Sequence, residues 1–408
     1  MQSMSDYYSA IQLRSDRWSA LREASVALTR AGKAKGSEAQ IKKINTLFDS
    51  LAPIEAYWAF PGVQAFDHIR RQFEHQNYQD AAYAIQRVAR GLATGAYRRR
   101  HVPLERGTET DDHEDEAIQS LEARALAKPY FEVMIVDDVN EHQERWLKSN
   151  FARMRRMEDP FHYETVVVPS LQDALIGVLF NHNIQAIVVR PGLIMESKIE
   201  LSILTRYLNR AGGINMIEAL SPEDYGPELC RLIARVRPEL DAYLVTDRSV
   251  EDIAGLDLGI CRRVFYNQED FLELHLNILR GVQARNKTPF FTALVEYSKQ
   301  PTGVFHAMPI SRGKSISRSH WIQDMGAFYG PNIFLAETSA TSGGLDSLLE
   351  PHGPIKEAQE LASRAFGSKQ TYFATNGTST CNKIVVQALV RPGDIVLVDR
   401  DCHKSHHY

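Results

Sequence analysis

The residues with the clearest chemical potential lie in the stretch TYFATNGTSTCNKIVVQALVRPGDIVLVDRDCHKSHHY (371–408). Gly377, Thr378, Ser379 and Thr380 combine a glycine, which lets the backbone approach a ligand closely, with three hydroxyl groups. Where such a turn opens a helix, free backbone N–H groups and the positive end of the helix dipole favour a phosphate. The run has neither the Walker spacing nor a GxGxxG fingerprint, and hydroxyl residues at a helix start also serve as ordinary caps. The four residues are therefore a candidate phosphate site.

His403 is the second candidate, because the surrounding pattern places it at the end of a strand. The sequence predicts a strand over 371–375, a helix over 381–390 and a second strand over 394–399. A right-handed crossover would make the two strands parallel, so that residues just beyond their carboxyl ends converge on one crevice. An imidazole there could lie flat against an aromatic ligand whose phosphate rests on the hydroxyl-rich turn. A single histidine is also commonly structural or solvated.

A separate α/β pattern precedes this region. Continuous apolar runs that alternate with helical stretches indicate a parallel sheet covered on both faces, as in flavodoxin-like and receiver-like domains. The predicted strands are 131–138, 163–170, 185–192, 214–219 and 242–247, and the predicted helices between them are 170–183 and 198–213.

This α/β segment lacks the residues for phosphoryl transfer. Asp137 and Asp138 end the first strand, as the magnesium-binding acidic pair of a receiver does. The third strand, however, carries Arg190 where a receiver has its phospho-accepting aspartate, and the strand that ends VTDR has no following lysine. Without an acceptor carboxylate there is no nucleophile, so a structural or regulatory role for the segment is the better interpretation.

The remaining segments give the domain organisation. Residues 1–104 are predicted as a helical region, 105–128 as an acidic linker with six carboxylates within 109–116, and 251–312 as a second linker. The receiver-like domain would occupy 129–250, and 313–408 would begin another α/β domain. The cluster from Arg98 to His101 could contact an acidic partner or simply be a solvated helix end.

Composition excludes several classes of protein. The 408 residues are 44% hydrophobic and 24% charged, with a net charge of −4, as in ordinary globular proteins. That charge balance provides no field for nucleic acid or an anionic membrane, and no apolar run approaches the length of a membrane helix. The first residues lack the pattern of a secretion signal, so a cytoplasmic protein is expected. Four cysteines that are far apart fit reduced thiols rather than zinc or a disulfide framework.

Three motifs together resemble the bacterial ornithine/lysine/arginine decarboxylases. These are GGLDSLLEPHGPIKEAQELASRAFGS (343–368), ATNGTSTCNKIVVQALVRPGDIVLVDR (374–400) and DCHKSH (401–406). The resemblance runs from about 289 to the last residue, and the receiver-like segment resembles the family's N-terminal wing domain. It implies pyridoxal 5'-phosphate as cofactor and the start of an aminotransferase-like domain of fold type I.

The resemblance also implies roles for individual residues. Ser379 and Thr380 would hold the cofactor phosphate, Gly377 and Thr378 would shape the turn, and His403 would stack on the pyridine ring. The reaction would be decarboxylation of lysine, arginine or ornithine to the amine and carbon dioxide. Relatives of this fold type imply an oligomer, a dimer or larger.

Two departures from the family pattern stand out. The Schiff-base lysine and the aspartate that pairs with the pyridine nitrogen lie far beyond the stacking histidine in the family, and Lys404 matches the stacking motif instead. The sequence is therefore expected to be the N-terminal part of a longer enzyme, inactive alone. In 305–314, only His306 remains of a His-Pro-Gly-His sequence found in shorter relatives, which leaves the substrate open. The alternative is a non-catalytic regulatory or assembly protein built on the receiver-like domain.

Overall fold

The computed structural model divides the chain into two compact units, 1–285 and 286–408. It describes the ranges 5–31, 37–99, 102–105, 128–156, 158–198, 221–266, 268–304, 310–315, 317, 319, 322–338 and 345–407. The acidic run at 109–116, the predicted strand at 214–219, nearly all of the predicted helix at 198–213, and His306 lie outside the described residues.

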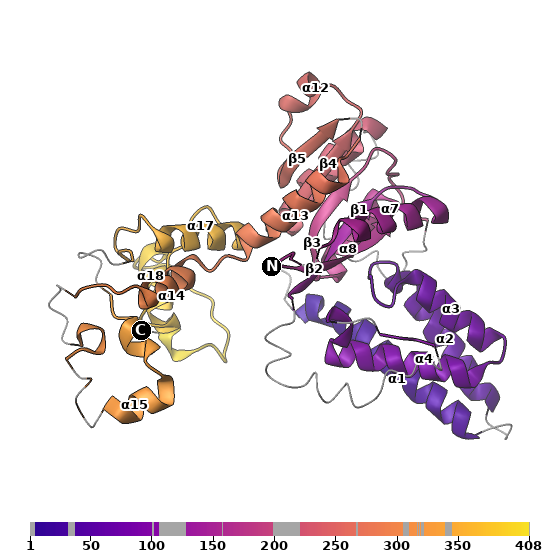
Figure 1. The fold of residues 1–408 in the computed structure, drawn as a ribbon, viewed down its shortest axis with the longest axis horizontal. Helices are drawn as coiled ribbons and strands as arrows, with labels where there is room; N and C mark the ends of the chain where they lie inside the picture. Colours follow the sequence, from indigo (N-terminus) through magenta and orange to yellow (C-terminus); the bar gives the residue numbers. More distant parts are fainter. Residues whose placement is uncertain are drawn as a thin grey trace. The chain divides into compact units, whose positions relative to one another are not determined.

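Figure 1 shows both units, with the first in indigo to orange. Its elements are α1 (Ser5–Ala31), α2 (Ser37–Glu55), α3 (Val63–Glu74), α4 (Tyr78–Thr94), η1 (Ala96–Arg98), β1 (Tyr130–Val136), α7 (Glu141–Met154), β2 (His162–Val168), α8 (Leu171–Phe180), β3 (Ile184–Val189), η2 (Pro222–Asp224), α11 (Tyr225–Val236), β4 (Asp241–Thr246), α12 (Val250–Ala254), β5 (Cys261–Tyr266) and α13 (Phe271–Arg285). The second unit contains α14 (Pro289–Lys299), η3 (Ser311–Gly313), α15 (Ile322–Tyr329), α16 (Asn332–Leu335), α17 (Pro354–Phe366), α18 (Thr378–Leu389) and η4 (Lys404–His406).

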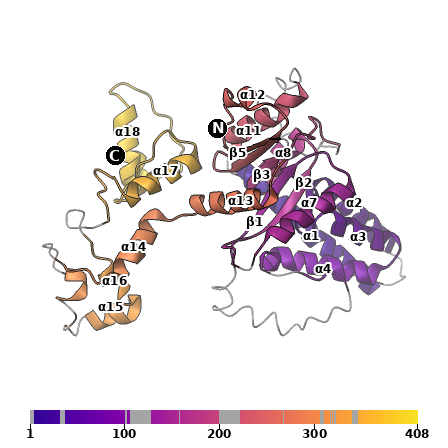
Figure 2. The same ribbon diagram turned by 45° about the horizontal axis from the view of Figure 1, so that its top comes forward.

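The five strands form a parallel sheet in the order β2-β1-β3-β4-β5, which confirms the predicted parallel α/β sheet. Helices cover both faces (Figure 2). Phe131, Val133 and Ile135 of β1 join a core cluster with α7 and α13, whereas Met134 and Val136 join the opposite cluster with α8 and α11. Because successive side chains point to opposite faces, a strand covered on both sides must be apolar throughout.

Strand β5 departs from the expectation, because the sequence predicted a linker over 251–312. Its sequence CRRVFY forms the outer strand beside β4, and α13 follows it onto the sheet. Arg262 and Arg263 are exposed on this outer strand. An outer strand needs no continuous apolar run, so the pattern that revealed the inner strands was missing here.

The N-terminal helices α1–α4 have a core of their own, which includes Trp18, Phe48 and Phe66. Helix α4 ends at Thr94, and the next residue, Gly95, adopts the left-handed conformation with φ 66° that commonly terminates a helix. None of the described helices is both long enough and apolar enough to cross a membrane.

The helical region also shares a core with the sheet. Ile54, Tyr57 and Trp58 belong to the same buried cluster as α8 and α11. The Tyr57 hydroxyl donates a 2.8 Å hydrogen bond to Asp173, the first acidic residue of α8. Because buried polar groups require partners, these contacts fix how the helices dock on the sheet within this unit.

In the second unit, Arg312 joins the end of α14 and the residues after it to the end of α16. This residue is 7% exposed, and its guanidinium donates to the carbonyl oxygens of Tyr297, Ser298, Gln300, Thr302 and Leu335. The planar guanidinium has five N–H groups, which suits it to several carbonyls at once.

The two strands predicted at 371–375 and 394–399 are not formed, which corrects the expected crevice between neighbouring strands. Helix α18 between them is formed, but neither flanking segment pairs in a sheet in the described part of this unit. Ile395 and Leu397 are about nine-tenths exposed, at 90% and 93%. Parallel strands need several neighbours and cover on both faces, and these two segments have neither.

Candidate functional site

The start of α18 has the backbone conformation predicted for an anion-binding turn. Gly377 immediately precedes the helix with φ 81°, a left-handed value that favours glycine. Its carbonyl accepts from the amide of Thr380 at 3.0 Å, and the Thr380 hydroxyl donates to the carbonyl of Asn376 at 3.2 Å. The first amides of a helix have no partner within it, so those of Thr378 and Ser379 are directed outward. This turn is exposed.

Ser405 links His403 to this helix by hydrogen bonds on both sides. The Nδ1 of His403 lies 2.9 Å from the hydroxyl of Ser405 and accepts the backbone N–H of the same residue at 3.2 Å. The side-chain amide of Asn382 donates to that hydroxyl at 2.8 Å. Ser405 is 4% exposed and so forms the buried centre of the link. Because Asn382 follows Thr378 by one helical turn, the link connects His403 to the beginning of α18.

The hydrogen bonds also determine which atoms of His403 are available. A nitrogen that accepts a backbone N–H cannot itself carry a proton, so a neutral imidazole would have its proton on Nε2. Nδ1 is thus occupied by hydrogen bonds within the protein. The exposed ring leaves one aromatic face and the Nε2–H donor for a ligand. The sequence identified His403 and the 377–380 turn, but it gave no sign of the contact between Asn382 and Ser405.

The donor set at α18 fits a phosphate. It provides neutral donors, namely two outward amides and the hydroxyls of Thr378 and Ser379. The positive end of the dipole of this twelve-residue helix adds a favourable field for an anion. A pyridoxal phosphate with its phosphate at this turn would require an aromatic-stacking group nearby, which the ring of His403 could supply. The residues present therefore fit this cofactor in their chemistry.

A second organised loop lies ahead of α17 and was missed at the sequence level. The carboxylate of Asp346 accepts the backbone N–H groups of Ser347, His352, Gly353 and Ile355 at 2.8–2.9 Å. Burial raises the pKa of this carboxyl, but the four N–H donors together outweigh that effect and lower the pKa to about 2. An aspartate within a Gly- and Pro-rich stretch was the available signal.

The C-terminal edge of the sheet contains ion pairs where a receiver has its phosphorylation site. Arg190 pairs with both Asp137 and Glu269, and Lys198 pairs with Asp138. Burial raises the pKa of Asp137, an effect that the guanidinium of Arg190 opposes. Across the described ranges, no three acidic, histidine or cysteine side chains are grouped to hold a metal ion. Arg190 thus offsets the charge of Asp137 and Glu269 at this edge of the sheet, a pairing that the sequence did not predict.

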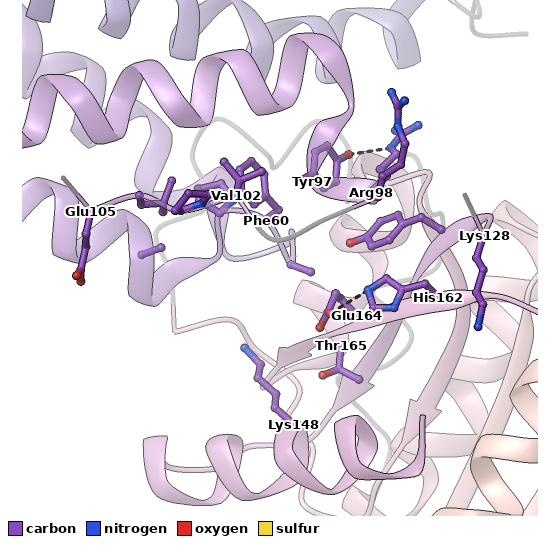
Figure 3. A pocket seen from close by; sticks show the side chains of 17 residues that line it. Phe60, Tyr97, Arg98, Val102, Glu105, Lys128, Lys148, His162, Glu164 and Thr165 are labelled. Atoms are coloured by element: carbon purple, nitrogen blue, oxygen red, sulfur yellow. Dashed lines mark hydrogen bonds and ion pairs between the residues drawn. The ribbon is translucent and has the colours of Figure 1, made fainter. Parts of the chain in front are cut away.

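A cavity of about 940 Å³ lies within the first unit, between the helical region and the edge strand β2. Figure 3 shows Phe60, Tyr97 and Arg98 on one side, and His162 and Glu164 of β2 on the other. The rings of Phe60 and Tyr97 stack with centroids 4.8 Å apart. Arg98 and Arg99, from the basic cluster noted in the sequence, line this cavity, whereas Arg100 and His101 lie outside the described residues.

The charges of this cavity are largely balanced within the protein. Burial alone would raise the pKa of Glu164, but hydrogen bonds from His162 and Arg155 lower it to about 2. Arg155 donates to both oxygens of Glu164, at 2.7 and 2.9 Å. Lys148 pairs with Glu144 of its own helix at 2.7 Å. The cavity therefore presents an aromatic wall and mixed charge rather than a purely basic pocket.

Residues 288–408 match the family model "Orn/Lys/Arg decarboxylase, major domain". This segment is therefore similar to the major domain of the ornithine/lysine/arginine decarboxylases, and it makes up less than a third of the chain.

The chain is similar to several curated members of this family. It is 37% identical to the lysine decarboxylase of Pseudomonas aeruginosa over 187 residues, which are 44% of this chain and 25% of the relative. It is 30% identical to the constitutive ornithine decarboxylase of Escherichia coli over 177 residues, 43% of this chain and 24% of the relative. The matches thus span about a quarter of the length of these relatives. The solved lysine decarboxylase of Francisella novicida aligns with a TM-score of 0.33 and 23% identity, over 67% of this chain and 34% of that one.

Proposed function

We propose that this chain contributes the cofactor-phosphate and ring-stacking residues of a decarboxylase that converts lysine, arginine or ornithine to the amine and carbon dioxide. The observation that carries the proposal is the hydrogen-bonded link from His403 through Ser405 to Asn382 of α18. This link holds the imidazole to the helix whose first turn offers the phosphate donors.

The residues would divide the work of binding. Ser379 and Thr380 would donate to the cofactor phosphate, Thr380 once its hydroxyl releases the carbonyl of Asn376, and Gly377 and Thr378 would hold the turn that directs the first amides outward. The ring of His403 covers one face of the pyridine, held in place by Ser405. When bound, pyridoxal phosphate supplies an electron sink for the loss of carbon dioxide. The contribution of these side chains is to orient and retain the cofactor.

The 408-residue chain alone is expected to bind the cofactor weakly and to have no turnover. The family's cofactor-bonding lysine and its pyridine-pairing aspartate have no matching motif in this sequence, and Lys404 belongs to the histidine motif. Relatives of this fold type favour an oligomer for the active enzyme. Which basic amino acid is the substrate depends on acidic groups that the described residues do not identify.

A binding experiment tests the cofactor proposal without requiring activity. Binding of pyridoxal phosphate to the full chain is measured by equilibrium dialysis, with inorganic phosphate as competitor. Ser379→Ala and Thr380→Ala should each weaken binding about 10-fold or more, because a hydrogen bond to a charged group contributes about 1.5–3 kcal/mol. Ser368→Ala is the matched control, since it removes an exposed hydroxyl from the same unit without touching α18.

The ring-stacking role has its own test. His403→Phe retains an aromatic face and should keep most of the affinity, whereas His403→Ala should lose it about 5-fold or more. Equal binding by all the variants, or no displacement by phosphate, would remove the assignment of the turn and the imidazole.

The second candidate function is a non-catalytic regulatory or assembly module. It is favoured by the ion pairs of Arg190 with Asp137 and Glu269, which replace a phosphorylation site by a neutralised, structural edge. A full chain that binds no pyridoxal phosphate but forms a stable complex with a separate decarboxylase subunit would support this function instead.

A further inference from the structure

Two cysteines that are far apart in the sequence are brought together in the first unit. Cys230 lies on α11 and is fully buried, and Cys261 is the first residue of the outer strand β5. The loop before β5 lies directly on α11, because a Cβ placed on Gly259 would come 2.9 Å from Cβ of Ala234 and 3.4 Å from the carbonyl oxygen of Cys230. Cys261 packs against the same buried cluster that contains Cys230.

The two thiols also differ in accessibility. Cys261 is partly exposed, whereas Cys230 is covered by the core. The side chains of Cys230 and Cys261 interact with each other, and the Cys261 sulfur contacts the carbonyl oxygen of Arg263 at 3.3 Å. A small oxidant can therefore reach the thiol of Cys261, whereas the neighbouring thiol of Cys230 is shielded.

We propose that Cys230 and Cys261 form an oxidation-sensitive dithiol, which a hydroperoxide converts to a disulfide that ties the outer strand β5 to α11. The loop that leads into Cys261 lies against the part of α11 that carries Cys230, so the two cysteines are on adjoining segments, as a disulfide between them needs. This modification is independent of the cofactor site and of the reaction that the chain serves.

The reaction balances with a hydroperoxide as the only co-reactant. The thiolate of Cys261 attacks one peroxide oxygen, the O–O bond breaks, and hydroxide leaves to take up the proton that the thiol released. The sulfur of Cys230 then attacks the resulting sulfenic acid, the S–O bond breaks, and a second water forms. In total, two thiols and one hydrogen peroxide give one disulfide and two waters.

The electrostatics agree with this order of events. Interaction with the neighbouring thiol of Cys230 lowers the pKa of Cys261, which outweighs the opposing effect of burial. The same interaction and complete burial raise the pKa of Cys230. The accessible cysteine is thus the better nucleophile, and the buried one resolves the sulfenic acid.

The test uses the full chain treated with a small excess of hydrogen peroxide, followed by non-reducing peptide mapping. The expected product is a linked pair of peptides containing Cys230 and Cys261, two hydrogens lighter than their sum, which dithiothreitol separates. Oxidation should also raise Tm, because a cross-link restricts the unfolded chain.

Matched variants distinguish this pair from the other two cysteines. In Cys230→Ser, Cys261 should accumulate as a sulfenic acid that dimedone traps, whereas in Cys261→Ser the buried Cys230 should remain unmodified. The double variant Cys381→Ser/Cys402→Ser should still form the disulfide. The sulfur of Cys402 lies 3.4 Å from His407, so this cysteine is the competing site. Oxidation confined to Cys381 and Cys402 would overturn the proposal. The proposal would also fail if Cys261 reacts no faster than these two.

Discussion

Replacing Glu132 by alanine is expected to lower the free energy of unfolding of the first unit by about 2–4 kcal/mol at neutral pH. Glu132 is fully buried at the centre of β1. One carboxylate oxygen accepts from the amide of Ala59 at 3.1 Å and from Asn181 at 2.7 Å, and the other accepts from the hydroxyl of Tyr130 at 2.9 Å. These partners come from the helical region and from the sheet, so the carboxylate joins the two.

The magnitude follows from which donors lose their partner. An unsatisfied buried donor costs about 1–3 kcal/mol, but Asn181 also donates to the carbonyl of Tyr57 and Tyr130 is only partly buried. The main loss falls on the amide of Ala59, with smaller losses at the other donors. Glu132→Gln keeps one carbonyl oxygen for Ala59 and Asn181, so it should cost about 1 kcal/mol.

Urea denaturation followed by tryptophan fluorescence measures both variants, with Glu141→Gln on the surface of α7 as control. The control should change stability by less than about 0.5 kcal/mol. Equal stability of the alanine variant and the wild type would show that the carboxylate does not hold the helical region to the sheet.

The pH dependence provides an independent check on Glu132. Burial raises its pKa in the folded state, and the hydrogen bond from Asn181 opposes this only in part. A raised folded pKa means that stability is fully present below the unfolded pKa and is lost as the pH rises through the folded one. The advantage of wild type over Glu132→Gln should therefore shrink from about pH 4 upward. An advantage that grows with pH would refute the reasoning.

Two further substitutions test the ion-paired sheet edge and the loop before α17. Arg190→Met leaves the nearly buried Asp137 and Glu269 without their shared cation, so it should cost about 3 kcal/mol at neutral pH, and the deficit in urea denaturation should shrink as acid protonates the carboxylates. A deficit independent of pH would contradict this ion pairing. Asp346→Asn should speed amide hydrogen exchange at Gly353 and Ile355, which lose their charged acceptor. Because the folded pKa of Asp346 is lowered to about 2, its contribution is present above the unfolded pKa and lost as the pH falls through about 2, and unchanged exchange in the variant would count against this role.

The inner part of the sheet could be predicted because burial on both faces leaves a continuous apolar run. The run from Phe131 to Val136 is apolar except at Glu132, and it forms β1. The outer strand β5 could not be predicted in this way, since solvent on one side permits Arg262 and Arg263. The opposite error occurred at 394–399, where an apolar run lies in an extended but unpaired segment. An apolar run in the sequence shows that a segment favours burial. Whether neighbouring strands and helices bury it depends on the tertiary structure, which the local sequence does not show.

The candidate site was predictable to the extent that it depends on local chemistry. Gly377 has the left-handed φ that an exposed helix start with a glycine suggests, and the motif resemblance identified His403. The hydrogen bond between Asn382 and Ser405 joins residues 23 positions apart, and neither residue type distinguishes itself in the sequence. The pairing of Cys230 with Cys261 was missed for the same reason, because two widely spaced cysteines carry no sign of proximity.

The common core of Ile54, Tyr57 and Trp58 with α8 and α11 has a practical consequence for anyone shortening this polypeptide. A truncation that begins at β1 would remove Ile54, Tyr57 and Trp58 from the buried cluster that they share with α8 and α11, and would leave Asp173 without the hydrogen bond from Tyr57. Such a fragment should precipitate or associate with itself, whereas one that ends at Arg285 retains every layer of the first unit. The end of α2 and the residues that follow it are therefore part of the core of the first unit, and removing them should expose apolar surface.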